Sequence, residues 1–283
     1  MERKLILRGL LVGAVGGLFA AVFARIFAEP VISRAIAYES GRNAAQDALD
    51  KVAGLPAVAA APDIFSRTIQ ANLGVGAGMI AFGAAMGTLF AIVYTICLGR
   101  TGRIGPRTLA LLVALGGFLA FYLVPFVKYP TNPPAIGHED TIKERSGLYL
   151  VMLAASVVLL ALTVLMGKRL QARFGNWTAT LIAAAAFMVA VGVVMAVLPP
   201  LGMLATNVQH FGAHVTETPL PLTAPDGTIV YPGFPADDLF QFRFYSVAAQ
   251  LTVWTAIGLL FAPLADRLLD QAKWGTGRSV FGR

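Results

Sequence analysis

Six stretches of the chain are apolar over about 20 residues each, and shorter polar segments separate them. A helix needs about 20 apolar residues to cross roughly 30 Å of bilayer hydrocarbon. Polar and apolar positions do not alternate strictly within the stretches, so the pattern favours helices over barrel strands. The predicted spans are residues 5–28, 73–98, 109–127, 148–167, 179–198 and 244–264. We therefore expect an all-α polytopic bundle of about six transmembrane helices, with residues 1–283 as one membrane domain.

Basic residues concentrate on one side of this arrangement. The termini and the loops on that side carry a net charge of +10, and the loops 29–67, 128–147 and 199–243 carry −3, which together give the +7 of the chain. The positive-inside rule predicts that both termini are cytoplasmic and that these three longer loops are external. We expect a multi-pass protein of a bacterial-type inner membrane. Its basic charge then reflects contact with membrane lipids and not with nucleic acid.

Three local features refine the prediction. The run from residue 5 to 28 exceeds the apolar core of a signal peptide, about 7–15 residues, and indicates a retained helix that ends before Pro30. In the first outer loop, residues 33–52 are predicted to form a helix lying on the membrane interface. In the second, Pro130, Pro133 and Pro134 exclude a helix.

Small residues recur every four positions on the first two predicted helices. They are Gly9, Gly13 and Gly17 on the first, and Gly74, Gly78, Gly83 and Gly87 on the second. Such spacing lets helix backbones approach closely in lipid. The stripes are typical of packing within the bundle, and a homo-oligomer face is the alternative.

Motifs for nucleotide hydrolysis and common catalytic centres do not occur in the sequence. It has no Gly-Lys-Ser/Thr phosphate loop, no HExxH and no nucleophile elbow. The single cysteine, Cys97, cannot form a disulfide within the chain. We therefore expect a protein that is not an enzyme and has no ATPase of its own.

Several stretches resemble the CbtA family of proposed cobalt transporter subunits, and they follow one another over essentially the whole chain. They are residues 23–30 with 34–39, residues 102–107, residues 121–135, Asn176-Trp177 with Thr180-Leu181, and Phe242-Arg243 with Ser246, Gln250 and Trp254. The resemblance implies cobalt uptake under cobalamin-linked control, together with a small single-span partner, CbtB, that carries a histidine motif. The chain departs from the family in having no histidine between Gly41 and Pro62 and in its six predicted spans, where five are usual.

Imidazole and carboxylate groups are the ligands that suit Co²⁺. The three histidines of the chain all lie in the predicted outer loops. The candidate metal-binding residues are His138, Glu139 and Asp140, and His210 with His214, which share a face if that segment is helical; Glu217 is near them in sequence. Solvated loop side chains are the alternative interpretation. We expect no tightly bound cofactor, with Co²⁺ as the transported ion.

A second set of polar residues borders the predicted spans. Arg25 and Glu29 stand at i and i+4 at the outer end of the first helix, where a charge is costly unless it is paired or reaches the interface. With Lys128, Tyr129 and Asn132 they form the candidate transport pathway; an ion pair or snorkelling arginine is the alternative at Arg25 and Glu29. The sequence thus predicts a divalent-metal uptake subunit, with a non-transporting accessory subunit of a larger complex as the alternative.

Overall fold

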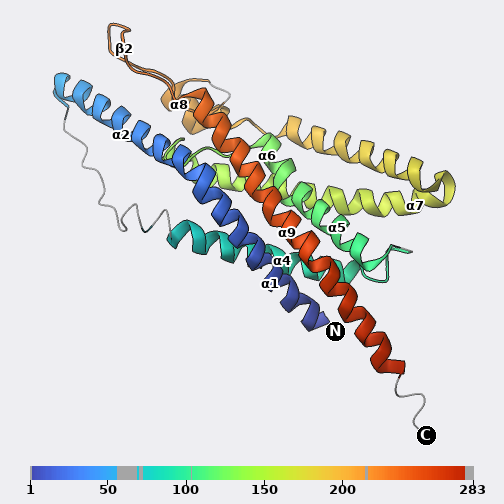
Figure 1. Ribbon diagram of the computed structural model, residues 1–283. Coiled ribbons are helices and arrows are strands. Elements are labelled where there is room, and N and C mark those ends of the chain that lie inside the picture. Colours follow the sequence, from blue (N-terminus) through green and yellow to red (C-terminus); the bar gives the residue numbers. More distant parts are fainter. Residues whose placement is uncertain (1, 56–68, 70–72, 103, 214–215, 278–283) are drawn as a thin grey trace. The chain divides into compact units, whose positions relative to one another are not determined.

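The computed structural model describes residues 2–55, 69, 73–102, 104–213 and 216–277 (Figure 1). Helices make up 81% of the chain, which confirms the expected all-α class. The elements in order are α1 (Glu2–Phe23), η1 (Ala24–Ala28), α2 (Glu29–Val52), α4 (Val75–Cys97), α5 (Pro106–Gly117), η3 (Phe118–Leu123), α6 (Val124–Lys128), η4 (Glu139–Thr141), α7 (Ile142–Val197), η5 (Leu201–Met203), α8 (Ala205–Phe211), β1 (Leu222–Thr223), β2 (Ile229–Tyr231) and α9 (Ala236–Gly277).

Five helical stretches within the described residues are long and apolar enough to cross a membrane. Four of them correspond to one expected span each. The remaining one contains both the fourth and the fifth, because α7 reverses its direction at Gly175, as Figure 1 shows. Gly175 has φ 73° and ψ 171°, a backbone conformation that glycine adopts without a steric penalty. The two arms pack together, and a Cβ on Gly167 would lie 3.3 Å from the Cβ of Ala183.

The sequence predicted that the first helix ends before Pro30, and this prediction is wrong. Helical residues run without a break from Glu2 to Val52. The π-turn η1 ends two residues before Pro30, where the helix continues. Proline has no N–H and its ring clashes with the carbonyl four residues earlier in an α-helix, and a wider π-turn relieves both problems. The same arrangement recurs where the π-turn η3 precedes Pro125. Residues 33–52 are helical as expected.

The third expected outer loop contains regular structure that the sequence analysis did not anticipate. Strands β1 and β2 pair antiparallel around the turn at Asp226-Gly227, where Gly227 has φ 85°. Thr228 N–H donates to the Asp226 carboxylate across this turn. Helix α9 begins at Ala236, eight residues before the expected span, and Asp237 and Asp238 in its first turn suit the positive end of the helix dipole.

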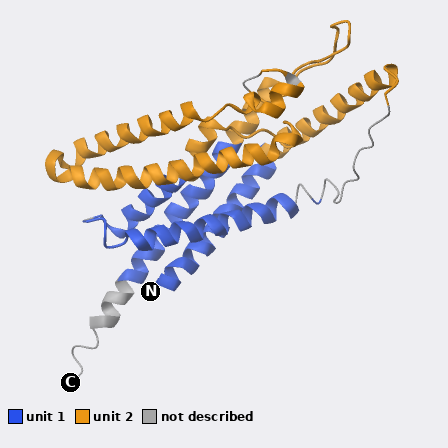
Figure 2. Ribbon diagram, turned by 180° about the vertical axis from the view of Figure 1, so that it is seen from behind, with its two compact units in different colours: residues 1–27, 63–119, 246–283 blue, residues 28–62, 120–245 orange. Residues whose placement is uncertain are grey.

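The chain divides into two compact units, coloured separately in Figure 2. Unit 1 comprises Met1–Phe27, Asp63–Leu119 and Ser246–Arg283. Unit 2 comprises Ala28–Pro62 and Ala120–Tyr245. Within the described residues, the boundaries between the units fall inside η1, inside η3 and inside α9.

Unit 1 is built on a close crossing of α1 and α4. A Cβ placed on Gly13 would overlap the Gly83 carbonyl oxygen and lie 2.8 Å from Gly87 Cα. Gly9 meets the Gly87 carbonyl in the same way, and Gly17 lies 2.8 Å from a Cβ on Gly83. The two backbones therefore touch over two helical turns, which only glycine permits.

The glycines at the start of the second predicted helix behave differently. Among the described residues, no atom lies within 4 Å of a Cβ on Gly78, and Gly74 meets only the Ile69 carbonyl oxygen at 3.8 Å. Glycines that the stripe pattern missed make close contacts instead. Gly16 faces α9, with the Val253 carbonyl oxygen 3.1 Å from its Cβ position, and Gly117 packs against the ring of Trp254.

Aromatic side chains form a second buried contact in unit 1. Phe90, Tyr94 and Phe261 are almost fully buried, and both α4 rings meet Phe261 edge to face, with centroids 4.9 and 5.0 Å away. Such pairs stabilise a core beyond their area of contact. They join α9 to α4.

Unit 2 has two apolar clusters. One joins α2 to the hairpin and the loop after α6 through Ala35, Tyr38, Ile136 and Phe234. The other joins α6 to both arms of α7 through Val124, Tyr129, Met152 and Val191. Together they hold residues 129–141 between α2 and α7.

Candidate functional site

The most prominent polar feature of unit 2 is a buried carboxylate, Glu217, whose side chain is completely enclosed. Its Oε1 accepts hydrogen bonds from Thr141 Oγ1 and Asn207 Nδ2, each at 2.6 Å. Its Oε2 lies 3.0 Å from Arg145 Nη1, an ion pair whose angles fall outside hydrogen-bond geometry. A buried carboxylate is costly unless such partners compensate for lost water. Glu217 therefore ties residues 141–145 to the segment around α8.

Gly137, in the loop before α7, leaves room for the side chain of Arg145. Gly137 has φ 136°, and a Cβ there would lie 2.5 Å from Arg145 Nη1 and 3.5 Å from Glu217 Oε2. Any side chain at Gly137 would thus displace the guanidinium from the carboxylate. Arg145 Nη2 also donates to the His138 carbonyl at 3.2 Å. Gly137, Arg145 and Glu217 therefore depend on one another for their positions.

Two residues before Gly137 the backbone adopts a conformation that non-glycine residues rarely take. Ala135 has φ 70°, in the left-handed region where a Cβ is disfavoured. Ile136 is 4% exposed and packs in the cluster with Ala35 and Tyr38, which holds the segment in place. Strained backbone of this kind persists only where its surroundings fix it, and it gathers at functional sites.

His138 is oriented by the same network. Asn207 Nδ2 donates to the Leu201 carbonyl at 2.8 Å as well as to Glu217, so both amide protons face acceptors. The Asn207 oxygen must then face His138 Nδ1, which lies 2.6 Å away and carries the proton. In the neutral imidazole this assignment leaves the lone pair on Nε2, the arrangement that protein metal ligands commonly have.

The other candidate metal-binding residues do not gather around His138. Glu139 and Asp140 are exposed in η4, and His210 is exposed on α8. His214 lies outside the described residues. Within the part of the chain that the structure describes, no group of three His, Cys, Asp or Glu side chains is arranged to hold a metal ion.

Two carboxylates of unit 2, those of Glu39 and Glu139, nevertheless lie close enough for their charges to interact. The pKa of Glu39 on α2 is raised above its usual value, first by burial and then by the negative charge of Glu139. Glu139 and Asp140 adjoin His138 in sequence. The region around His138 is therefore locally acidic, which favours the approach of cations.

The candidate pathway residues fall in both units. Arg25 is exposed on η1 in unit 1, and Glu29 is 8% exposed at the start of α2 in unit 2. The π-turn between them changes the i, i+4 register that an α-helix would provide.

The remaining three pathway candidates follow one another at the end of α6. Lys128 Nζ lies 5.6 Å from the centroid of the Tyr129 ring. The Tyr129 hydroxyl donates to the Pro199 carbonyl at 2.9 Å. Asn132 Oδ1 accepts from Arg243 Nη2 at 2.9 Å, and Arg243 Nε donates to the Thr131 carbonyl at 3.3 Å. Arg243 thus fixes the proline-rich segment to α9.

Sequence reasoning found His138 but not the groups that orient it. Thr141 and Arg145 are one helical turn apart where α7 begins, and this i, i+4 spacing was a usable signal. Asn207 lies on the short helix α8 and Glu217 in the irregular segment after it, and no periodic pattern indicates that either side chain is buried.

Comparison with known proteins places the chain in a family. A family model described as "Probable cobalt transporter subunit (CbtA)" matches residues 2–266 of the 283. A search of the curated proteins and a search of the solved structures each gave no match. The matched range includes α1 through most of α9, together with the network around Glu217. The chain is therefore a member of the CbtA family of probable cobalt transporter subunits.

Proposed function

We propose that this chain is the membrane-embedded subunit of a divalent-metal uptake system whose substrate is Co²⁺. The observation that carries the proposal is the family match over residues 2–266, in a chain with five helical stretches suited to a membrane among its described residues. The sequence has no phosphate-binding loop, so the energy for uptake comes from an ion gradient or from another subunit.

His138 is the residue best suited to meet the metal. Its Nδ1 donates to Asn207, and the proposal assigns Nε2 as the ligand atom, since an imidazole nitrogen suits Co²⁺ or Ni²⁺ better than Mg²⁺. The exposed carboxylates of Glu139 and Asp140 raise the local concentration of divalent cations. A single protein imidazole gives weak, reversible capture, as an uptake site requires.

A partner completes the metal site in this proposal. The described residues contain no group of three suitable ligands, and the proposal assigns the further ligands to water or to another subunit. A small single-span CbtB-like protein with a histidine motif fits that need. Glu29, buried at the start of α2, lines the cation path.

Cellular cobalt uptake tests the proposal. Cells with this chain and its small partner should accumulate radiolabelled Co²⁺ above cells with either alone. His138→Ala should reduce uptake at low metal concentration and much less at saturating concentration, as expected for loss of a capture site. His210→Ala, an exposed histidine on α8, is the matched control. Glu29→Gln should lower the maximal rate. Equal uptake with His138→Ala and His210→Ala would shift metal selection to the partner.

The absence of a three-ligand group in the described residues also supports a second candidate, an accessory subunit that transports nothing. Its external segments would then bind the other proteins of a complex. No Co²⁺ accumulation above background with both proteins present would favour this candidate.

A further inference from the structure

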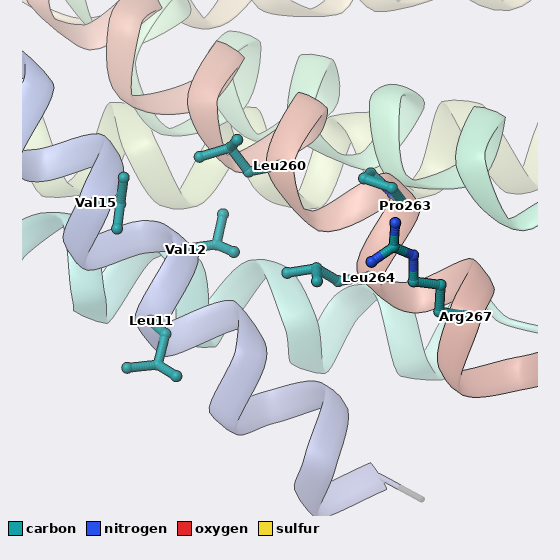
Figure 3. A pocket seen from close by; sticks show the side chains of 7 residues that line it. All are labelled: Leu11, Val12, Val15, Leu260, Pro263, Leu264 and Arg267. Carbon is teal, nitrogen blue, oxygen red and sulfur yellow. The ribbon is translucent and has the colours of Figure 1, made fainter. Parts of the chain in front are cut away.

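Unit 1 contains an apolar groove between α1 and α9, with a volume of about 380 Å³ (Figure 3). Six of its lining residues have aliphatic or proline side chains, and the seventh is Arg267. They are Leu11, Val12, Val15, Leu260, Pro263, Leu264 and Arg267.

Two guanidinium groups stand at one end of the groove. Arg267 lies two helical turns from Leu260 along α9, and Figure 3 shows it at the end of the row of lining residues. Arg8, one turn before Leu11 on α1, donates from Nη1 to the Leu264 carbonyl at 2.5 Å. The two arginines therefore belong to the same end.

Asp266, next to Arg267 in sequence, is paired with another arginine. Asp266 forms an ion pair with Arg107, whose Nε lies 2.8 Å from Asp266 Oδ2. Among the described residues, no ion pair of Arg267 with an acid is present. The groove thus combines an apolar lining with two guanidinium groups at one end.

We propose that this groove binds an anionic phospholipid, with one acyl chain along the apolar residues and the phosphate against Arg267 and Arg8. Both helices run through predicted spans, so the groove lies where acyl chains are available. Basic pockets between transmembrane helices select anionic headgroups, because each cation near the surface contributes about 1 kcal/mol. The acyl chain of a zwitterionic lipid would also pack against the apolar residues, but its headgroup would bring no net negative charge to Arg267 and Arg8.

Native mass spectrometry tests this proposal. Full-length protein is equilibrated with equal amounts of phosphatidylglycerol and phosphatidylcholine that have the same acyl chains. The parent should retain phosphatidylglycerol preferentially, and Arg267→Gln should lower the ratio about fivefold. Arg169→Gln, an exposed arginine on α7, is the charge-matched control and should leave the ratio unchanged.

A second pair of variants tests the apolar part. Val15→Trp fills the groove and should reduce retention of both lipids, whereas Val22→Trp, on the same helix but outside the lining, should not. Equal retention of the two lipids by the parent would overturn the proposal. The same ratio in Arg267→Gln and Arg169→Gln would also overturn it, as would indistinguishable retention by Val15→Trp and Val22→Trp.

Discussion

Replacing Gly13 with leucine tests whether the contact between α1 and α4 depends on glycine. The first side-chain carbon would overlap the Gly83 carbonyl oxygen and lie 2.8 and 2.9 Å from Gly87 Cα and N. These are backbone atoms, so no rotamer change can make room. The two helices would have to separate and lose the adjoining contacts at Gly9 and Gly17 as well.

The expected change in the free energy of unfolding is a packing penalty reduced by a gain in helix propensity. Overpacking a well-packed contact typically costs about 1–3 kcal/mol, and a backbone obstruction belongs at the upper end. Leucine gains up to about 0.8 kcal/mol over glycine in helix propensity, which offsets a small part. We therefore expect a net loss of about 2 kcal/mol or more in the free energy of unfolding.

Gly78→Leu provides the matched control. It makes the same chemical change inside α4, but no described atom lies within 4 Å of its Cβ position. Thermal unfolding in detergent should give a Tm at least about 4 °C lower for Gly13→Leu than for the parent, and an unchanged or slightly higher Tm for Gly78→Leu. Equal Tm values for the two variants would refute the glycine-contact argument.

Three further predictions concern topology, the buried carboxylate and pH. Reporter fusions at Gly102, Gly175 and the C-terminus should be cytoplasmic, and one at Gly227 external; a C-terminal reporter outside would contradict the charge argument. Glu217→Gln should destabilise the segment around α8 by about 1–3 kcal/mol and speed its proteolysis, since Arg145 loses its counter-ion; unchanged cleavage would count against the network. The pKa of Glu39 is raised in the folded protein, so its contribution to stability is present when the carboxyl is protonated and is lost as pH rises through that pKa. Glu39→Gln stays neutral at every pH and should therefore raise Tm more at about pH 7 than at about pH 4. An equal effect at both values would exclude this role.

The helices were predictable because their apolar runs are long and nearly free of charge. What the sequence could not show was how the runs connect. Pro30 is an ordinary helix-stop signal, but the π-turn at Ala24–Ala28 lies just before it and α1 continues into α2. Gly175 looked like part of a loop, but helix continues on both sides of this single residue.

The candidate site was predictable only in part. His138 stands out because the chain has three histidines, and its residue type alone indicates metal chemistry. Its orientation depends on Asn207 and Glu217, which are about 70 and 80 residues further along the chain. Nothing in an irregular proline-rich segment indicates which polar side chains will be buried together. Only the tertiary structure brings these residues to the histidine.

Transport by purified protein tests the central claim most directly. The chain and its small partner would be reconstituted together into proteoliposomes that enclose a Co²⁺-sensitive fluorescent dye, with an ion gradient imposed across the membrane. The proposed function predicts Co²⁺-dependent quenching that requires this chain, needs a higher Co²⁺ concentration with His138→Ala, and is unaffected by His210→Ala. Quenching no faster than in liposomes that contain only the partner would contradict a transport role for this chain.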